Sequence, residues 1–457
     1  MSPHLRAVVI HGHFYQPPRD DPWLDRVLAE PSAAPFHDWN ARIEHECYGP
    51  LVANGALTGI SFDFGSTLFE WLERNAPATY AGVLDADRVS AARLGGHGNA
   101  IAQPYHHVIL PLATRREKVT EVRWGIADFR RRFGRTPEGM WLPETAVDEE
   151  TLDVLAEEGI QFTVLAPHQV AGAPARGEPG RVRTSRGRSI ALFVYDGGLA
   201  QGVAFGDSLK DAGAWAGQLL SRDSNVVSLA TDGESYGHHR KGGDQVLASV
   251  IATLRARPDV TLENFSSYLA RHPATQEVQL VAPTSWSCAH GVERWRSDCG
   301  CKMAVDRPSQ QKWRTPLRNG LNWLAEQLHR IYERESAGII ADPWAARDTF
   351  GEVVGRLDRG AKTGRERDLL ELERNALRMF TSCGWFFDDI AGIEAVQILR
   401  YAARAIDLAG PDGPALESGL LERLAVAQSN DPGAGNGRDV FRDLVRGRVV
   451  TAGDERP

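Results

Sequence analysis

The chain has 457 residues, 42% hydrophobic and 25% charged, a composition typical of a globular protein and not of a disordered one. Its length exceeds what one compact core usually holds, which predicts two domains. The formal net charge is −8, and arginines alternate with acidic residues throughout. This pattern excludes the basic surface needed to bind nucleic acid or an anionic membrane, whereas a neutral, hydroxyl-rich substrate fits it.

No apolar stretch is long enough to cross a bilayer, and the amino terminus leads into a predicted strand without a secretory hydrophobic segment. The five cysteines are an odd number in a chain without an export signal, so no disulfide framework is predicted. These features predict a cytoplasmic protein that needs no membrane partner. They do not indicate an oligomeric state.

Strand-like and helix-like segments alternate through the first part of the chain. The predicted strands are 6–10, 60–64, 137–142, 162–165, 188–195, 226–230 and 278–282. The predicted helices are 41–54, 67–74, 78–94, 115–133, 148–159, 212–221 and 244–257. Such alternation implies parallel strands joined by crossover helices, and therefore an α/β fold.

Beyond about residue 283 the periodicity becomes helical. The predicted helices are 316–334, 342–357, 366–381, 392–408 and 415–428, with a loop at 430–437 and a frayed tail at 453–457. We therefore expect a (β/α) barrel domain at residues 1–285 and a helical domain at residues 286–457.

Two carboxylates, Glu144 and Asp232, each follow a short apolar run and precede a helical pattern. In barrels of parallel strands, catalytic groups collect at the carboxyl ends of the strands. Cleavage of a glycosidic bond without a metal requires two carboxyl groups, one to protonate the leaving oxygen and one to act from the opposite face of the ring. The alternative for either residue alone is a helix cap or a surface ion pair.

Histidines and aromatic residues gather in the same predicted rim segments. Seven of the 14 histidines lie there: His11, His13, His97, His106, His107, His238 and His239. Trp141 and Tyr236 lie beside the two acids and could stack on sugar rings. This concentration favours a binding site over a solvated surface.

Four motifs in this order resemble the signature regions of glycoside hydrolase family 57. They are His11-Gly12-His13-Phe14-Tyr15-Gln16-Pro17, Gln103-Pro104-Tyr105-His106-His107 followed by Val108 to Leu112, Met140-Trp141-Leu142-Pro143-Glu144, and Asp232-Gly233-Glu234-Ser235-Tyr236-Gly237-His238. The helical part resembles an uncharacterised domain found with this barrel in some bacteria. Residues Phe14-Tyr15 are inserted between His13 and Gln16, which departs from the family pattern.

The resemblance implies a distorted (β/α)7 barrel followed by a mainly α-helical domain, acting on α-glucans with retention of configuration and without a cofactor. It implies Glu144 as nucleophile and Asp232 as general acid/base, by hydrolysis or glucanosyl transfer on an oligo- or polysaccharide. His13 would line the subsite of the attacked sugar, and Trp141 would flank the nucleophile. The candidate substrate-binding residues are His11, His13, Gln16, His97, His107, Trp141, Glu234, Tyr236, His238, Trp286 and His290.

Two other functions stay open at this point. The barrel also resembles metal-dependent polysaccharide deacetylases and α-mannosidases, in which His11 and His13 with Asp232 and His238 could bind zinc. The other possibility is a non-catalytic homologue that keeps the barrel and binds glycans without cleaving them.

A second cluster lies near the expected domain junction, where Cys288, His290, Cys299 and Cys301 fall within one short segment. Three thiols and an imidazole could form a zinc site, although their spacings are tighter than those of usual structural sites. The alternative is a rim loop with free thiols, in which Trp286, His290 and Trp295 face the cleft. A further aromatic cluster at Trp385 indicates core packing more than sugar binding.

Overall fold

The computed structural model describes residues 6–306, 308–355 and 364–447. The chain forms two compact units, and neither is continuous in sequence. The first comprises Met1–Gln16, Ala29–Tyr105 and Gly125–Trp286, and the second comprises Pro17–Leu28, His106–Trp124 and Ser287–Pro457. Two segments from the amino-terminal half therefore belong with the second unit.

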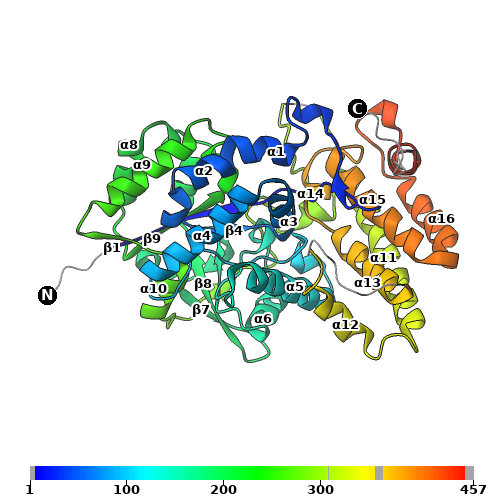
Figure 1. Ribbon diagram of the computed structural model, residues 1–457, viewed down its shortest axis with the longest axis horizontal. Coiled ribbons are helices and arrows are strands. Elements are labelled where there is room, and N and C mark those ends of the chain that lie inside the picture. The colour runs from blue at the N-terminus through cyan, green and yellow to red at the C-terminus, as the bar shows by residue number, and fades with distance from the viewer. Residues whose placement is uncertain (1–5, 307, 356–363, 448–457) are drawn as a thin grey trace. The chain divides into compact units, whose positions relative to one another are not determined.

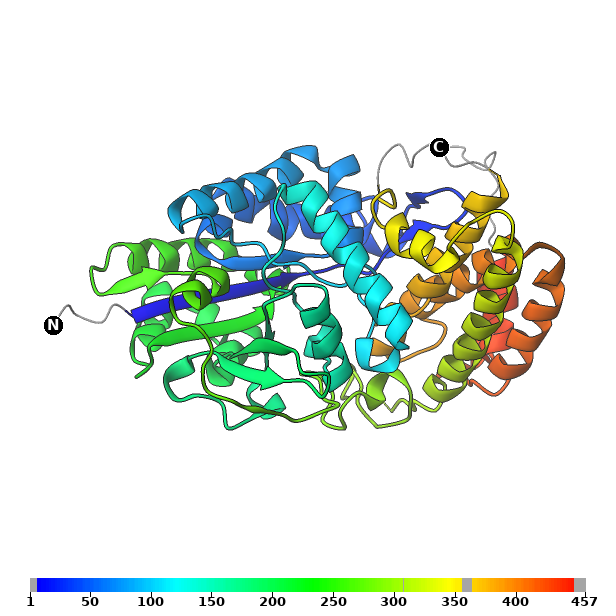
Figure 2. The same cartoon turned by 90° about the horizontal axis from the view of Figure 1, so that it is seen from below.

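Strand β1 (Arg6–Phe14) lies at the centre of the first unit. It pairs in parallel with β9 (Val226–Asp232) along its length. It pairs with β10 (Val260–Leu262) near its start and with β4 (Ser61–Phe64) near its end, also in parallel. Figures 1 and 2 show β1 as the long dark-blue strand beside the green β9. Its residues 7–14 are all buried, as expected for a strand covered on both faces.

Parallel pairing continues from β4 around the first unit. Phe62 bridges to Ala100, Ala102 to Met140 and Gly139 to Phe162. From there β5 (Phe162–Leu165) pairs in parallel with β8 (Ser189–Val194). After β8, the amide of Asp196 donates to the carbonyl of Ser228 in β9 at 2.7 Å, which closes the circle. In the described part of the chain the parallel order is β9, β1, β4, 100–102, 139–140, β5, β8, the seven-stranded barrel that the resemblance implies.

One predicted barrel strand is wrong. The segment 278–282 forms only β11 (Gln279–Leu280), which pairs antiparallel with β6 (Val170–Ala171). The strand that pairs in parallel with the start of β1 is β10, whose three residues are too short to give a sequence pattern. The segment predicted at 188–195 is β8, and β7 (Gly180–Arg183) pairs with it as an antiparallel hairpin.

Helices follow the strands, and all but those at 197–204 and 265–271 lie where the periodicity predicts. They are α1 (Trp39–Ile43), α2 (Gly49–Ala53), α3 (Ser66–Asn75), α4 (Pro77–Arg93), α5 (Arg115–Phe133), α6 (Glu149–Glu157), α7 (Gly197–Ala204), α8 (Ala212–Leu220), α9 (Gly243–Arg255) and α10 (Phe265–Arg271). Helix α6 begins where Asp148 accepts a hydrogen bond from the amide of Thr151. Helix α5 ends before Gly134, whose φ of +66° suits glycine.

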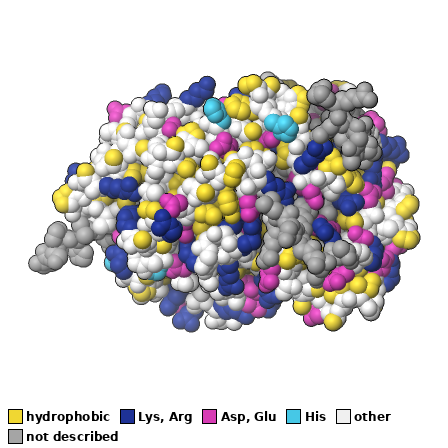
Figure 3. All heavy atoms as spheres, in the orientation of Figure 1, with side chains coloured by type: hydrophobic (Ala, Val, Ile, Leu, Met, Phe, Trp, Pro, Cys, Tyr) yellow, Lys and Arg dark blue, Asp and Glu magenta, His cyan; other side chains and the backbone are white. Residues whose placement is uncertain are grey.

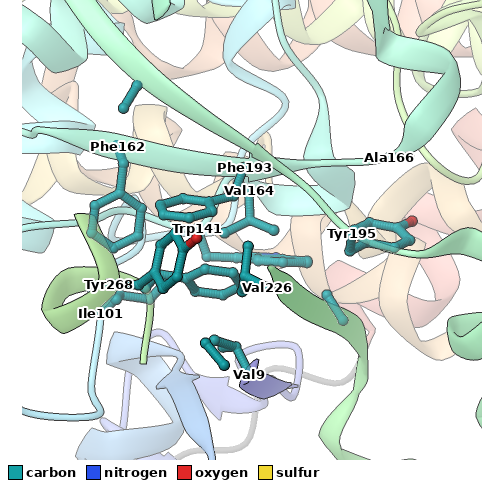
Figure 4. Packing of buried hydrophobic residues seen from close by; sticks show 14 of the residues in the cluster. Val9, Ile101, Trp141, Phe162, Val164, Ala166, Phe193, Tyr195, Val226 and Tyr268 are labelled. Atoms are coloured by element: carbon teal, nitrogen blue, oxygen red, sulfur yellow. The ribbon is translucent and has the colours of Figure 1, made fainter. Parts of the chain in front are cut away.

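An aromatic core fills the first unit (Figure 4). Phe162 and Phe193, from the paired strands β5 and β8, meet at 5.5 Å with their rings at 83°. Phe265 of α10 packs against both. Trp141 belongs to the same cluster and is fully buried. The core therefore fixes the segment that carries Glu144.

The second unit is helical. Its helices are α11 (Arg314–Ser336), α12 (Pro343–Phe350), α13 (Arg365–Arg378), α14 (Cys383–Phe386), α15 (Ile393–Leu408), α16 (Gly413–Leu424) and α17 (Gly437–Val440), and its strands are β2 (Asp20–Asp21) and β3 (Arg26–Val27). Trp385 is fully buried and stacks on Phe380, so core packing explains its cluster. The end of the helix predicted at 342–357 and the tail 453–457 lie outside the described residues. None of the helices within those residues has the length and hydropathy to span a membrane.

Candidate active site

The register of the central strands places three polar side chains at one level of the barrel. His13 of β1 pairs with Asp63 of β4 on one side and with Asp232 of β9 on the other. All three positions lie at the carboxyl ends of their strands, where ligands bind in parallel-stranded barrels. The two neighbouring strands therefore bring an acid to either side of one histidine.

Asp63 holds both histidines of the first motif. Its two carboxylate oxygens bind His11 Nε2 at 3.0 Å and His13 Nδ1 at 2.8 Å, and the carboxylate is fully buried. His11 Nδ1 lies 3.0 Å from the hydroxyl of Ser61. Both ring nitrogens of His11 are thus engaged inside the barrel, and its burial lowers its pKa.

Trp141 connects this cluster to Glu144. Its ring stacks on His11 at 4.9 Å and on His13 at 5.1 Å, and it meets Trp286 edge-on at 5.2 Å. The indole N–H of Trp286 donates to Glu144 Oε2 at 3.0 Å, and its backbone amide donates to the Glu144 carbonyl at 3.0 Å. Glu144 is therefore fixed at both its backbone and its carboxylate.

The backbone of Glu144 is strained. Glu144 has a φ of +59° and Thr145 a φ of +47°, two consecutive left-handed residues that are not glycine. Such a conformation costs about 1–2 kcal/mol per residue. The Thr145 carbonyl accepts a hydrogen bond from Gln169 Nε2 at 2.8 Å, which helps to hold the turn. Strain of this kind is concentrated at functional sites, and here it directs the Glu144 side chain.

Asp232 has the electrostatics of a proton donor. Loss of hydration among the surrounding side chains, together with the negative charges of Glu144 and Asp63, raises its pKa to about 6, although the charge of His13 opposes the shift. Asp232 nevertheless remains exposed to solvent. A carboxyl group that is accessible and also holds its proton more tightly than usual is suited to general acid catalysis.

Glu234 is a second acid with a raised pKa, but it is buried. Burial and the charge of Asp232 raise its pKa to about 7, while a hydrogen bond from Tyr48 opposes the shift. The Tyr48 hydroxyl donates to Glu234 Oε1 at 2.5 Å, and the backbone amide of Tyr15 donates to the same oxygen at 3.1 Å. Tyr15 belongs to the two residues that depart from the family motif, so this insertion helps to hold Glu234. Gln16 also hydrogen-bonds the side chain of Tyr48.

His13 is the cation among these carboxylates. Burial alone would lower its pKa, but the charges of Asp63, Asp232 and Glu234 raise it to about 9. At neutral pH His13 therefore carries a positive charge between two acids. His238, from the loop after β9, binds Glu46 Oε2 at 2.5 Å and faces the edge of Trp39.

Two expected binding residues lie elsewhere in the first unit. The ring of Tyr236 is fully buried and stacks on Trp215, so neither of its faces can receive a sugar. His97 precedes the bridge at Ala100 and binds Glu138, which precedes the bridge at Gly139. His97 and Glu138 therefore lie at the amino ends of their strands, opposite the edge that carries Asp232 and Glu144. The prediction that His97 lies on the rim is wrong.

His107 and His290 belong to the second unit. His107 is buried, has a φ of +56°, and its Nδ1 lies 2.7 Å from the hydroxyl of Ser382. His290 is exposed and lies beside Cys301. The second motif groups His107 with the acids of the barrel, and His290 was expected in a loop facing the cleft, whereas the fold assigns both residues to the second unit.

Asp63 and Glu46 lie in none of the sequence motifs, and Gln103 begins the second motif but was not among the candidate binding residues. Asp63 and Ser61 alternate within a predicted apolar strand, and that alternation was the available signal. Gln103 follows the strand segment 100–102 and is buried, and neither its oxygen nor its nitrogen has a hydrogen-bond partner in the structure. A buried amide with unused hydrogen-bonding capacity at this edge is suited to a polar ligand.

The set that could have bound a catalytic zinc is already engaged in hydrogen bonds. Both nitrogens of His11 are bound to Ser61 and Asp63, and His238 is bound to Glu46. Among the described residues, one group of histidine, cysteine or acidic side chains has at least three ligand atoms close enough to share an ion. That group lies outside this set and consists of Cys288, His290, Cys299 and Cys301. The geometry therefore does not favour the metal-dependent alternative at the barrel.

Comparison with known proteins identifies the barrel and the helical part. Residues 58–281 match the model of glycosyl hydrolase family 57, and residues 310–454 match a domain of unknown function, DUF3536. The chain is 25% identical over 182 residues to alpha-amylase 1 of Dictyoglomus thermophilum, covering 39% of this chain and 26% of that protein. It is 23% identical over 224 residues to the 4-alpha-glucanotransferase of Thermococcus litoralis, covering 46% of this chain and 32% of that protein. The chain thus spans about a quarter to a third of the length of these curated relatives.

A solved structure matches nearly the whole chain. The exo-type maltose-forming amylase from Pyrococcus sp. ST04 superposes with a TM-score of 0.72 at 13% identity, over 96% of this chain and 91% of that one. At this identity the likeness shows the fold. Together with the family match it confirms the (β/α)7 barrel and the family that the motifs resemble.

Proposed function

Because the chain carries a glycosyl hydrolase family 57 domain, we propose that it is a retaining enzyme that cleaves or transfers α-glucosidic bonds. The substrate is an oligo- or polysaccharide, and the reaction needs no cofactor. The single observation that carries this proposal is that Asp232 ends β9 and Glu144 closely follows the bridge at Met140, so both acids lie at the same edge of the barrel. A retaining mechanism requires two carboxyl groups about 5 Å apart. The charge of Glu144 also contributes to the raised pKa of Asp232.

In the proposed reaction, Glu144 attacks the anomeric carbon while Asp232 protonates the leaving oxygen. The glycosyl–Glu144 intermediate is then resolved by water or by a sugar hydroxyl, with Asp232 now acting as the base. The hydrogen bond from the Trp286 indole orients the Glu144 carboxylate for attack. The carboxyl group of Asp232 supplies the proton for the first step, and its raised pKa helps it to hold that proton.

The other residues of the cluster take positioning and binding roles. His13, charged at neutral pH, would donate to a hydroxyl of the attacked sugar and balance the acids on either side. His11 would act through Asp63, since its own nitrogens are engaged. We propose Gln103 as an additional substrate contact because its buried amide has no partner in the structure. His238, held by Glu46 next to Trp39, would bind more distant sugars.

Glu234 is the alternative proton donor, because its pKa is also raised, to about 7. Glu234, however, is only 4% exposed and its carboxylate accepts two hydrogen bonds, whereas Asp232 is open to solvent. Accessibility favours Asp232 as the group that reaches the substrate. Glu234 would instead act on the charges around it, since its own charge helps to raise the pKa of His13.

The surface and the cysteines bear on the partners and the location. On the face drawn in Figure 3, positive and negative side chains intermingle over the described residues, and a neutral glycan suits such a surface. We also propose a cytoplasmic location, because the five cysteines, all among the described residues, form no disulfide, and thiols persist in a reducing compartment. We propose that the domain boundary lies close to residue 286, between the two family matches.

Incubation with maltooligosaccharides and with branched α-glucans, followed by sizing of the products, tests the proposed activity. Shortened products indicate hydrolysis, and longer or branched products indicate transfer. Proton NMR of the first products reports the anomer, and retention is expected. No turnover of any α-glucan, or products of inverted configuration, would contradict the proposal.

A further inference from the structure

Three thiols and one imidazole of the second unit converge in the loop that precedes α11. Cys288, His290, Cys299 and Cys301 each present one ligand atom, and these atoms all lie within 4.8 Å of one another. Cys288 is buried, Cys299 and Cys301 are partly exposed, and His290 is exposed. The barrel chemistry uses none of them.

The spacing of these atoms matches a tetrahedral zinc site. Zinc binds thiolate sulfur at about 2.3 Å and imidazole nitrogen at about 2.0–2.1 Å, so tetrahedral ligands lie about 3.8 Å apart for two sulfurs and about 3.6 Å apart for sulfur and nitrogen. In the structure Cys288 Sγ lies 3.9 Å from Cys299 Sγ and 3.8 Å from Cys301 Sγ. Cys301 Sγ lies 3.7 Å from His290 Nδ1.

The loop is held in this shape by two buried arginines. Arg314, fully buried at the start of α11, donates to the carbonyl of Cys301 at 2.8 Å. Arg294, also buried, donates to the carbonyls of Ser287 and Phe386. A zinc ion with three thiolates and one imidazole carries a net negative charge, which the nearby guanidinium of Arg314 complements.

Two glycines make the tight spacings possible. Gly291 and Gly300 have φ values of +82° and +81°, each next to a cysteine or histidine of the cluster. The amide of Gly291 donates back to the carbonyl of Cys288 at 3.2 Å, closing a turn between Cys288 and His290. These turns let a Cys-x-His pair and a Cys-x-Cys pair face one point, which the sequence spacing alone did not indicate.

We propose that Cys288, His290, Cys299 and Cys301 bind one structural Zn²⁺ ion. The site offers four protein ligands and no open position, which is typical of structural and not of catalytic zinc. Three thiolates select zinc over the magnesium and calcium ions that prefer oxygen ligands. The thiols lose their protons on binding, and the metal fixes a loop in which the described residues form a single 3-10 turn, Glu293–Trp295.

Metal analysis of the purified full-length chain tests the proposal, with Cys299→Ser and Cys301→Ser as the test variants. Cys383→Ser is the matched control, since Cys383 is a partly exposed thiol of the same unit outside the cluster. We expect about one zinc per chain in the wild type and in the control, and loss of that zinc in both test variants. A zinc-loaded wild type that retains no metal after desalting, or test variants that keep their zinc, would overturn the proposal.

Cobalt binding to the wild type gives a result that does not depend on the folding of a variant. After removal of bound metal with a chelator, titration with Co²⁺ is expected to produce the visible absorption of a tetrahedral thiolate site. The band should saturate at one equivalent and disappear when Zn²⁺ is added. Absence of that band, or a thiol titration that finds a disulfide among the three cysteines, would exclude the zinc site.

Discussion

Charges are arranged differently in the two units. At the barrel rim, the acids Asp63, Asp232 and Glu234 lie around the charge of His13, and the pKa values of Asp232 and Glu234 are raised to about 6 and about 7. In the helical unit, the acids Glu117 and Glu373 are paired with cations, and the pKa of Glu117 is lowered to about 2. The first arrangement keeps protons on acids, and the second keeps acids ionised.

The helical arrangement centres on His329. Its two ring nitrogens bind Glu373 at 2.9 Å and Glu117 at 3.3 Å, and Arg347 binds the other oxygen of Glu373 at 2.8 Å. Although burial opposes it, the two carboxylates raise the pKa of His329 to about 9. Two cations and two anions thus neutralise each other inside the unit. The comparison teaches that pairs of opposite buried charges stabilise the fold. Like charges held close together cost folding free energy, but they also shift pKa values, which a reactive site can use.

The largest expected effect is the loss of turnover on Glu144→Gln. Removal of the nucleophile should lower kcat on the order of 10⁴-fold while glycan binding persists. Steady-state kinetics with a maltooligosaccharide measures it. Glu138→Gln is the matched control, because Glu138 lies on the same segment at the opposite end of the strands, and it should remain active. An equal loss of kcat in both variants would contradict the proposal that catalysis takes place only at the end of the barrel that carries Glu144.

The second prediction concerns the paired network. Glu373→Gln leaves Arg347 and His329 with one carboxylate between them, and loss of one partner of a buried pair costs about 3–5 kcal/mol. Urea unfolding followed by circular dichroism should show this loss. Glu371→Gln, on the same helix but partly exposed, should change stability far less. A Glu373→Gln protein as stable as the wild type would refute the structural role of the network.

Trp286→Phe should have a smaller effect on catalysis. It removes the hydrogen bond to the Glu144 carboxylate, and a bond to a charged group contributes about 1.5–3 kcal/mol, or about 10–100-fold in rate. The loss should appear in kcat more than in KM. Trp215→Phe removes an indole of the same unit that is fully buried and whose N–H has no partner, and it should leave kcat nearly unchanged. A wild-type kcat in Trp286→Phe would show that this bond does not orient the acid.

The smallest expected effect is on the pH dependence of stability. The folded protein holds the Asp232 proton more tightly than the unfolded chain does, so this group contributes stability at low pH that is lost as the pH rises from about 4 through about 6. Asp232→Asn removes that dependence. We expect its Tm to exceed that of the wild type increasingly between pH 4 and 7. A constant difference in Tm across this range would show that the pKa of Asp232 is not raised.

The sequence predicts the barrel well because its strands are short apolar runs that end in polar motifs. The segment 162–165 and the helix 115–133 were predicted to the residue. Strand β10 was missed because three residues carry no periodicity, and residues 17–28 and 106–124 could not be assigned to the second unit because their contacts are distant in sequence. The sequence also points to the two acids, because Asp232 ends a strand and Glu144 comes shortly after the bridge at Met140, and their catalytic roles stay a prediction.

For the rest of the site, the sequence could not predict the direction in which each side chain points. His97 and Tyr236 lie in predicted rim segments, but His97 precedes its strand and Tyr236 packs inward on Trp215. Asp63 was missed because a single acid in an apolar strand gives no motif of its own. Its role depends on the register of β4 against β1, which only the structure supplies.

Trapping of the covalent intermediate tests the central claim most directly. Asp232→Asn protein, incubated with α-maltosyl fluoride, whose leaving group needs no proton, should accumulate a maltosyl adduct because the second step lacks its base. Peptide mass spectrometry should locate the adduct on Glu144, and Glu144→Gln protein should form none. An adduct on Glu234 or another acid, or turnover of the fluoride without any covalent species, would contradict the assignment of Glu144 as the nucleophile.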